Sequence, residues 1–461
     1  MKHLYFLLFF SIALLQAQTY EVQNIKYSGD PTKRINFVIL SEGYQTAEFP
    51  QFVTDATNLM NDMFTQTPFA QYENYFNVYL IKVPSMESGA SHPSTASDEA
   101  SSPFVPVLSV NNYFGTTFDS FSIHRLLYSV NTSTIATVLA NNFPQYDQAL
   151  ILVNSPYYGG SGGLFPFSST ESSASEIAIH ELGHSFADLK DEYYPGDGLA
   201  AEAINMTQNN NPSTIKWKNW YGDNGIGAYA YGTSGTPATW YRPHQFCKMR
   251  YLGYPFCSVC TEGIIEKIHS LVSPIDSYSP VSSTVDNPTF PATFQLDLIE
   301  TIPNTLQTTW TLNASNFASN VASVNIQDTD LTDGSNTLSA VITDGTSLLR
   351  VDNHETIHVY TVTWMIDYSL GIDEISSSSN QININFYPNP VEDIMTIKTE
   401  NALNLNLTAR LLSLDGKLIK TFNLVNEVSQ EISIAEVSQG LYLLNFYEGT
   451  TQIASKKVVK N

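Results

Sequence analysis

Apolar positions in the first half of the chain alternate between strand-like runs and stretches with helical spacing. Short apolar runs at residues 35–40, 76–83 and 148–154 indicate buried strands. Between the first two runs, residues 48–66 carry apolar side chains at helical spacing, which predicts a helix. A strand, a helix and a strand in this order predict a parallel strand pair joined by a crossover helix.

The same reasoning predicts four more helices, at residues 122–127, 132–141, 175–188 and 261–272. The last of these closes the first domain. Residues 193–245 are polar and rich in glycine, asparagine and aromatic side chains, and they show little sign of regular structure. A loop of this length is usually functional or heavily anchored.

The pattern changes after residue 272. Short alternating runs rich in β-branched residues continue to about residue 368 and predict a β-sandwich of about 100 residues. Four consecutive serines ending at Ser379 predict a flexible linker, and strand-like patterns resume beyond it. The expected organisation is a leader at 1–17, an α/β (α+β) domain at 18–272, an all-β sandwich at 273–370, a linker at 371–381 and a second β-sandwich at 382–461.

The first residues predict export. Lys2 and His3 precede an apolar run from Leu4 to Leu15, and a small residue, Ala17, follows. This order is typical of a secretory signal peptide, and we expect cleavage after Ala17. The run is shorter than the roughly 20 residues that a membrane-spanning helix needs, and no later segment is apolar enough, so no transmembrane segment is expected.

Length and charge narrow the class of protein further. A chain of 461 residues favours two or three domains. The 21 basic and 44 acidic residues give a net charge of −23, and no basic run is present. This balance argues against nucleic acid and anionic membrane as partners.

The three cysteines, Cys247, Cys257 and Cys260, lie in one short segment. In an exported chain this spacing favours one local disulfide, with one thiol left over. A lone Cys-x-x-Cys pair can also be half of a zinc knuckle, but no second pair follows.

The clearest chemical signal is His180-Glu181-Leu182-Gly183-His184, an H-E-x-x-H motif within a predicted helix. Residues at i and i+4 lie on one helix face, so His180 and His184 can converge on one zinc ion. Glu181 lies beside that face, where it can deprotonate a zinc-activated water as a general base. The alternative is a pair of surface histidines, but the apolar face of this helix and the export signal favour zinc.

Zinc requires a third protein ligand and keeps its fourth position for water. Lys190 stands where an extended motif would place a third histidine, and an ammonium group cannot bind zinc. Asp191 is the best candidate, provided that the helix ends near Leu189 and the chain turns back. Glu192 is its competitor, whereas Asp188 would have to reach back along its own helix.

A second marker lies downstream, at Cys247-Lys248-Met249-Arg250-Tyr251. This segment resembles the methionine turn beneath the zinc ligands of metzincin peptidases. In some metzincins a tyrosine at the position of Tyr251 stabilises the oxyanion, so the resemblance implies a catalytic role for Tyr251. The alternative is that Met249 belongs to the core and Tyr251 is a packed aromatic side chain.

Several motifs between residues 20 and 272 together resemble the IgA peptidase family of secreted bacterial metalloendopeptidases. They are Leu40-Ser41-Glu42-Gly43-Tyr44, Phe76-Asn77-Val78-Tyr79, Glu87-Ser88-Gly89, residues 158–163, His180 to His184, Asp191-Glu192-Tyr193, and Met249 with its neighbouring cysteines. The resemblance implies a metzincin-like fold with a mixed twisted sheet and an active-site helix, and zinc-dependent cleavage of protein substrates. Immunoglobulin is one candidate substrate, although specificity would lie in the loop at 193–245.

The end of the chain resembles the C-terminal sorting domain of type IX secretion cargo. The matching residues are Tyr387-Pro388-Asn389-Pro390, Asp415-Gly416-Lys417, Gly440-Leu441-Tyr442 and the terminal lysines. This resemblance implies the type IX translocon as a partner and a secreted or cell-surface location. An ordinary accessory β-module is the alternative.

Two other functions deserve weighing. Residues 159–163 satisfy G-x-S-x-G, the nucleophile elbow of serine hydrolases, but Pro166 interrupts the helix that an elbow requires. A non-catalytic surface adhesin or glycan-binding protein, built on a peptidase scaffold, is the stronger rival. The intact His180, Glu181 and His184 argue against it.

Overall fold

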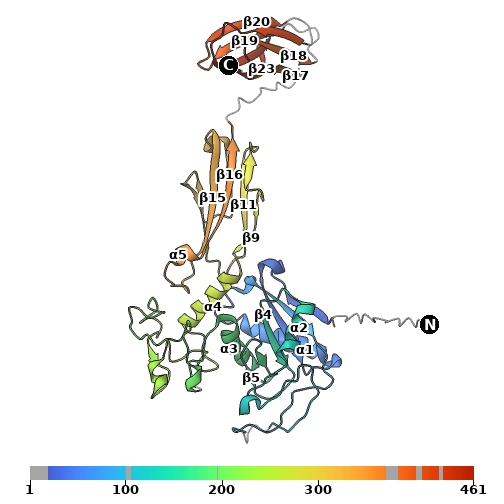
Figure 1. Cartoon of the computed structure of the whole chain (residues 1–461), viewed down its shortest axis with the longest axis vertical. Coiled ribbons are helices and arrows are strands. Elements are labelled where there is room, and N and C mark those ends of the chain that lie inside the picture. Colours follow the sequence, from blue (N-terminus) through green and yellow to red (C-terminus); the bar gives the residue numbers. More distant parts are fainter. Residues whose placement is uncertain (1–18, 100–104, 195, 370–382, 401–406, 425–428) are drawn as a thin grey trace, which may run out of the picture. The chain divides into compact units, whose positions relative to one another are not determined.

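The computed structural model describes residues 19–99, 105–194, 196–369, 383–400, 407–424 and 429–461 (Figure 1). The predicted signal peptide at 1–17 and the predicted linker at 371–381 lie outside the described residues. The chain divides into two compact units, residues 1–328 with 336–366 and residues 329–335 with 367–461.

The first unit contains a mixed six-stranded sheet with the strand order β1-β3-β2-β4-β6-β5. Its strands are β1 (Glu21–Lys26), β2 (Ile35–Glu42), β3 (Phe76–Lys82), β4 (Gln148–Val153), β5 (Gly160–Ser161) and β6 (Phe167–Ser168). Strand β2 pairs in parallel with both β3 and β4, whereas β1 and β5 pair antiparallel with their neighbours. Helix α1 (Phe49–Met63) connects β2 to β3, so the predicted parallel pair with a crossover helix is confirmed.

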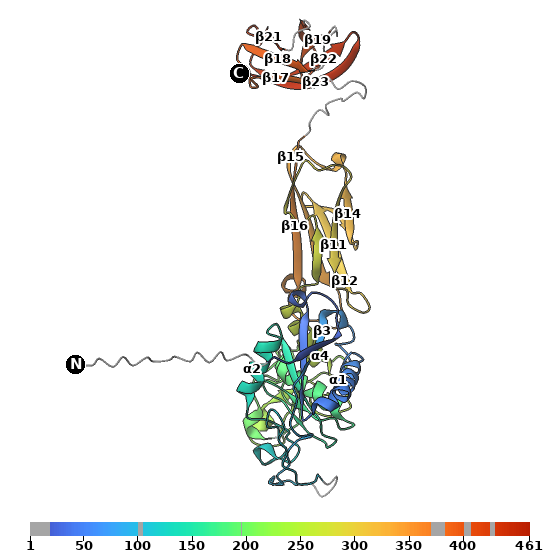
Figure 2. The ribbon, with the colours of Figure 1, turned by 90° about the vertical axis from the view of Figure 1, so that its right-hand side faces the viewer.

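Both faces of this sheet are buried, as expected for parallel strands covered by helices. Side chains of β2 alternate between two cores, with Phe37 and Ile39 in one and Val38 and Leu40 in the other. Helices α1, α3 (Ala174–Ala187) and α4 (Ser258–Leu271) contribute to the first core, and α2 (Thr132–Asn142) contributes to the second. Figure 2 shows α1 and α2 on opposite sides of β3. Four of the five predicted helices are therefore confirmed to within a few residues.

The prediction of a helix at residues 122–127 is wrong. The chain forms a short 3-10 turn at Ser120–Ser122, in which Phe121 and Ser122 have left-handed φ angles of 54° and 62°. Beyond the turn, Leu126 forms a bridge to Gly160, the first residue of β5. Hydrogen bonds to a distant segment here outweigh the local helical spacing.

The loop from 193 to 245 is heavily anchored, as its length suggested. The described part has only four short elements, which are the 3-10 turns Asp197–Leu199 and Thr236–Thr239 and the strands β7 (Tyr229–Ala230) and β8 (Tyr241–Arg242). Trp217 and Trp220 are both buried. The indole N–H of Trp220 donates to Glu262 Oε2 at 2.9 Å, which ties the loop to helix α4.

The rest of the first unit is all β, apart from the short helix α5 (His354–Ile357). A five-stranded sheet, β10-β16-β15-β12-β13, faces a three-stranded sheet, β14-β11-β9. Their bounds are β9 (Ile275–Ser279), β10 (Thr284–Asp286), β11 (Ala292–Leu298), β12 (Leu306–Leu312), β13 (Ser315–Ser319), β14 (Ser323–Ile326), β15 (Gly334–Asp344) and β16 (Val359–Tyr368). Trp364 stacks on Trp310 at 5.8 Å and meets Phe294 of the other sheet at 5.3 Å, so the sheets share one aromatic core.

The second unit contains two antiparallel sheets around a core that includes Ile397, Leu411 and Phe446. One sheet is β17 (Asn383–Tyr387), β18 (Ile394–Glu400) and β21 (Ser429–Ser433). The other is β20 (Leu418–Leu424), β19 (Leu407–Ser413), β22 (Gly440–Glu448) and β23 (Thr451–Lys460). The predicted β-rich C-terminal half is thus confirmed. Among the residues described, no helix has both the length and the apolar character needed to cross a membrane.

Candidate active site

Helix α3 carries the H-E-x-x-H motif and packs on the segment that contains Met249. A Cβ atom added to Gly183 would lie 2.6 Å from the Met249 sulfur, so only glycine permits this approach. On the same helix, the rings of His180 and His184 lie one turn apart, with their centroids separated by 5.0 Å.

The helix ends with a reversal of the chain. Asp188 adopts a left-handed conformation with φ of 54°, and the Leu189 N–H donates to the Gly183 carbonyl at 3.0 Å. This pattern closes helix C-termini and turns the following residues back along the helix. Asp191 is thereby brought to the face that carries His180 and His184.

One carboxylate oxygen of Asp191 meets both histidines. Asp191 Oδ1 lies 3.1 Å from His180 Nε2 and 3.2 Å from His184 Nε2. The other ring nitrogens contact backbone carbonyls, His180 Nδ1 at 2.9 Å from Lys248 O and His184 Nδ1 at 2.6 Å from Leu189 O. Because a carbonyl only accepts hydrogen bonds, each Nδ1 carries a proton and each Nε2 faces Asp191.

The electrostatics of this cluster favour positive charge beside the Asp191 carboxylate. Burial would lower the pKa of His184, but its hydrogen bond to Asp191 and the charge of that carboxylate raise it to about 9. Burial likewise opposes ionisation of Asp191, but the hydrogen bonds from both imidazoles hold its pKa well below the ordinary value. A cation held between these three side chains would supply positive charge at the same place.

Glu181 lies in the same buried pocket. Burial raises the pKa of its carboxyl above the ordinary value, and the charges of His180 and His184 oppose part of this rise. A Cβ atom added to Gly162 would lie only 2.6 Å from Glu181 Oε2. The glycine-rich segment after β4 therefore runs directly against the Glu181 carboxylate.

The three candidate carboxylates for a third ligand occupy different places. Of the three, Asp191 alone contacts both histidines. Glu192 is fully buried and turned away, with Oε1 accepting hydrogen bonds from Asn205 Nδ2 at 3.1 Å and Cys260 Sγ at 3.2 Å. Asp188 is exposed at the end of α3.

A cavity of about 480 Å³ opens beside the motif. Its lining includes His180, Glu181, Tyr193, Tyr251, Tyr158 and Arg125. Tyr251, which is 43% exposed, forms part of the wall, and the Arg250 guanidinium lies 4.7 Å above its ring. The structure therefore brings Tyr251 to the same cavity as Glu181.

Sequence reasoning predicted no side-chain role for three residues of this cavity, Tyr193, Tyr158 and Arg125. Tyr193 lies with its ring 6.5 Å from that of His180, and burial together with the charge of Asp191 raises its pKa to about 12. Its position directly after Asp191-Glu192 was the available signal. Tyr158 lies in the glycine-rich segment, whereas Arg125 lies within the wrongly predicted helix and had no local signal.

Ser161, the candidate nucleophile of the G-x-S-x-G pattern, is buried in β5. Its hydroxyl donates to the Leu127 carbonyl at 2.6 Å, and no helix follows the strand. The cysteine expectation also changes, because Cys247, Cys257 and Cys260 are all free thiols and the expected local disulfide is wrong.

An H-E-x-x-H helix beside a cavity in an α/β domain is the arrangement of a peptidase site. Residues 23–225 match the family described as IgA Peptidase M64, and residues 385–461 match the family described as Secretion system C-terminal sorting domain. Both predicted resemblances are therefore confirmed. The matches support a secreted peptidase that type IX sorting directs to the cell surface or the medium.

No curated protein matches this chain. Similar solved structures include latent PorU from Porphyromonas gingivalis, at 13% identity over 40% of this chain and 20% of that chain, with a TM-score of 0.15. The glucan-utilisation protein SGBP-B of Bacteroides ovatus matches at 14% identity over 39% of this chain and 42% of its own, with a TM-score of 0.16. The chain thus spans less than half the length of either protein, and these low scores carry no argument about its function.

Proposed function

We propose that this protein is a secreted zinc-dependent endopeptidase that hydrolyses peptide bonds of extracellular proteins. The family matches support a secreted peptidase, and one observation carries the metal-dependent part. A single oxygen of Asp191 lies at nearly equal distances, 3.1 and 3.2 Å, from the Nε2 atoms of His180 and His184. Ligands of a tetrahedral zinc ion at about 2.0–2.1 Å lie about 3.3 Å from one another, so the distances from Asp191 to both histidines fit a shared zinc ion.

His180, His184 and Asp191 would hold the ion. Zinc, when bound, would polarise the scissile carbonyl and make water more acidic. Glu181 takes a proton from the attacking water and transfers it to the leaving amine. Its raised pKa suits this exchange, because a more basic carboxylate accepts the proton more readily.

Tyr251 is proposed to donate its phenolic hydrogen to the oxyanion that develops on the substrate. Its place in the cavity wall beside Glu181 supports this role. The close approach of Gly183 to Met249 supports a metzincin-like arrangement, with the methionine segment packed against the active-site helix.

An extended substrate is proposed to lie along the glycine-rich segment after β4. Strand β5 is the last strand of its sheet, and Gly162 lies against Glu181. The segment at Leu126 already pairs with Gly160 on the outer side of β5, so an extended peptide would pair with the backbone beyond Ser161, where its scissile bond would lie near the general base. Immunoglobulin is one candidate substrate.

We also propose the domain limits 18–272, 273–370 and 382–461, with the last domain recognised by the type IX translocon. The match to the sorting-domain family over 385–461 supports this role.

The activity test compares wild-type protein from Gln18 to Tyr368 with Glu181→Ala on casein and immunoglobulin. We expect the wild type to cleave at least one substrate and Glu181→Ala to lose cleavage while it keeps its zinc. A chelator should abolish activity, and a serine-reactive fluorophosphonate should not. Equal activity in both proteins would refute the role of Glu181, and no zinc and no activity in either would favour the non-catalytic adhesin.

The ligand test compares zinc content and activity in Asp191→Ala and Glu192→Ala, and activity is the deciding readout because Glu192 lies in a separate cluster with the cysteines. We expect Asp191→Ala to lose about one zinc ion per chain together with activity, because it removes one of three protein ligands. Retention of all zinc and full activity by Asp191→Ala would refute the ligand assignment.

A further inference from the structure

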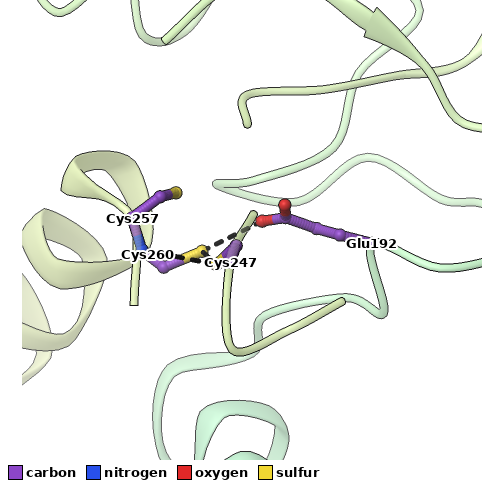
Figure 3. A group of neighbouring side chains, drawn as sticks. All are labelled: Glu192, Cys247, Cys257 and Cys260. Atoms are coloured by element: carbon purple, nitrogen blue, oxygen red, sulfur yellow. Dashed lines mark hydrogen bonds between the residues drawn. The ribbon is translucent and has the colours of Figure 1, made fainter. Parts of the chain in front are cut away.

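We propose that Glu192, Cys247, Cys257 and Cys260 form a second, structural zinc site separate from the histidine site. Figure 3 shows these side chains gathered at the first turn of helix α4. Each residue offers one ligand atom, and these atoms all lie within 4.8 Å of one another. Three sulfurs and one carboxylate form a closed four-ligand set, which is typical of structural rather than catalytic zinc.

The spacing fits a metal better than a disulfide. Cys247 Sγ and Cys260 Sγ are 3.7 Å apart, whereas bonded sulfurs lie about 2.05 Å apart. Zinc–sulfur bonds of about 2.3 Å place two ligands of a tetrahedral ion about 3.8 Å from each other. Glu192 Oε1, at 3.2 Å from Cys260 Sγ, occupies a neighbouring corner.

The carboxylate supplies an independent reason for a cation. Glu192 is completely buried, and its Oε2 atom has no hydrogen-bond partner. A buried carboxylate without compensation is costly, so such groups are usually paired or bound to a metal. A disulfide between any two of the cysteines would leave one buried thiol and would still leave Glu192 Oε2 without a partner.

The site would connect the segments that shape the candidate active site. Glu192 follows Asp191 directly, and its N–H donates to the Met249 carbonyl at 2.7 Å. Cys247 precedes Lys248, whose carbonyl meets His180 Nδ1. Cys257 and Cys260 anchor the cluster to helix α4. One ion would therefore hold the backbone on both sides of the histidine site, as a positioning element.

The test counts metal and thiols in the full-length chain purified without chelator. In a background that carries His92→Ala/His124→Ala, which removes a separate histidine–carboxylate cluster, we expect His180→Ala/His184→Ala to keep about one zinc ion per chain, since the thiolate set alone is sufficient for a structural site. Adding Cys257→Ser and Cys260→Ser to that background should remove it. Cobalt substitution should give a thiolate charge-transfer band that the serine variants lack.

Two outcomes would overturn the proposal. One is a histidine double variant that folds and holds no zinc. The other is a wild-type protein that yields a single free thiol under denaturing, non-reducing conditions, because that result indicates a disulfide.

Since a serine variant can fail to fold, Glu192→Gln serves as the second variant. It keeps the side-chain shape and should weaken zinc retention during titration with a competing chelator, whereas unchanged retention would remove Glu192 from the ligand set. Peptidase activity is not the readout, so failure here is distinct from failure of the proposed function.

A different cluster carries a second proposal. We infer that His92, Glu99, Asp119 and His124 bind a divalent cation in the connection between β3 and α2. Asp119 Oδ1 lies 3.4 Å from His92 Nε2 and 3.2 Å from His124 Nδ1. The two oxygens of Glu99 lie 3.4 Å from His92 Nε2 and 3.3 Å from His124 Nδ1.

These separations fit the roughly 3.3–3.4 Å between nitrogen and oxygen ligands of tetrahedral zinc. His92, Asp119 and His124 are buried, and His92 Nδ1 meets the Pro106 carbonyl at 3.1 Å, which directs Nε2 into the cluster. Because these four ligands are nitrogen and oxygen atoms with no sulfur, they suit zinc or manganese. A bound ion would secure the segment next to Arg125, which lines the active-site cavity.

The parent for this test is the full-length chain with His180→Ala, His184→Ala, Cys257→Ser and Cys260→Ser. The test adds His92→Ala/His124→Ala to this parent. We expect the parent variant to bind about one Zn²⁺ or Mn²⁺ in equilibrium dialysis, since four ligands suffice, and the added changes to abolish binding. Cation should also protect the chain near residues 91–124 from limited proteolysis. If the variant pair does not differ in binding, or if wild-type protein shows no cation-dependent protection, the cluster is only a histidine–carboxylate network.

Discussion

The contact between Gly162 and Glu181 provides the sharpest prediction for catalysis. Gly162 has no left-handed φ, so alanine is compatible with its backbone. The methyl group of Gly162→Ala would lie 2.6 Å from Glu181 Oε2, whereas ordinary contacts begin at 3.4 Å. The carboxylate must therefore move by about 0.8 Å, the difference between these distances.

A displacement of about 1 Å in a reacting group can cost about 100-fold in rate. We therefore expect Gly162→Ala to lower kcat by roughly 10- to 100-fold, which corresponds to about 1.4–2.7 kcal/mol in activation free energy. Zinc content should stay unchanged, because the same methyl group would lie at an ordinary 3.4 Å from the His184 ring.

The assay is steady-state cleavage of the best substrate found with wild-type enzyme, with zinc content and thermal unfolding measured on the same samples. Gly198→Ala is the matched control, since a Cβ at Gly198 meets no heavy atom within 4 Å. A Gly162→Ala enzyme with wild-type kcat and wild-type zinc would refute the placement of Glu181 as general base beside this segment.

Three further predictions concern stability and the oxyanion. Asp344 accepts hydrogen bonds from His269 Nε2 at 3.2 Å and from Tyr72 Oη at 2.5 Å. Burial alone would raise the pKa of the Asp344 carboxyl, but these hydrogen bonds outweigh burial and lower the pKa from 3.8 to about 2. A carboxyl group whose pKa is lower in the folded state than in the unfolded state stabilises the fold at pH values above its unfolded-state pKa. This stabilisation is lost as the pH falls through the folded-state pKa. Asp344→Asn should therefore cost about 2 kcal/mol of unfolding free energy at pH 7 and about half of that at pH 3. Urea unfolding at both pH values, followed by tryptophan fluorescence, measures this cost. If the difference in unfolding free energy between wild type and Asp344→Asn does not change with pH, the prediction is wrong. Gly183→Ala should destabilise by about 1–3 kcal/mol through overpacking against Met249, and Met249→Ala in the same chain should recover part of that loss in thermal unfolding. Tyr251→Phe should reduce kcat by about 10-fold or more with unchanged zinc if its hydroxyl stabilises the oxyanion, and an unaltered kcat would make Tyr251 a packed aromatic residue.

Most secondary structure of the first domain was predictable because its periodicity is local. Helix α1 and strands β2, β3 and β4 carry apolar patterns long enough to outweigh other contacts. The failure at 122–127 has the opposite cause. That stretch is held by hydrogen bonds to distant segments, including the bridge from Leu126 to Gly160, which no local pattern encodes.

By itself, the sequence determined the H-E-x-x-H helix and both family resemblances, and it predicted the export signal, because each depends on residues that are close together in the chain. It favoured Asp191 over Glu192 as the third ligand, but the two residues are adjacent and chemically alike, so the sequence could not show where each side chain lies. The reversal of the chain at Asp188 turns Asp191 towards His180 and His184, and Glu192 towards the cysteines. Only the tertiary structure decides this, because the direction of a side chain after a turn depends on the path of the whole backbone. The same is true of Arg125 in the cavity and of the thiol cluster, which are assembled from segments far apart in sequence.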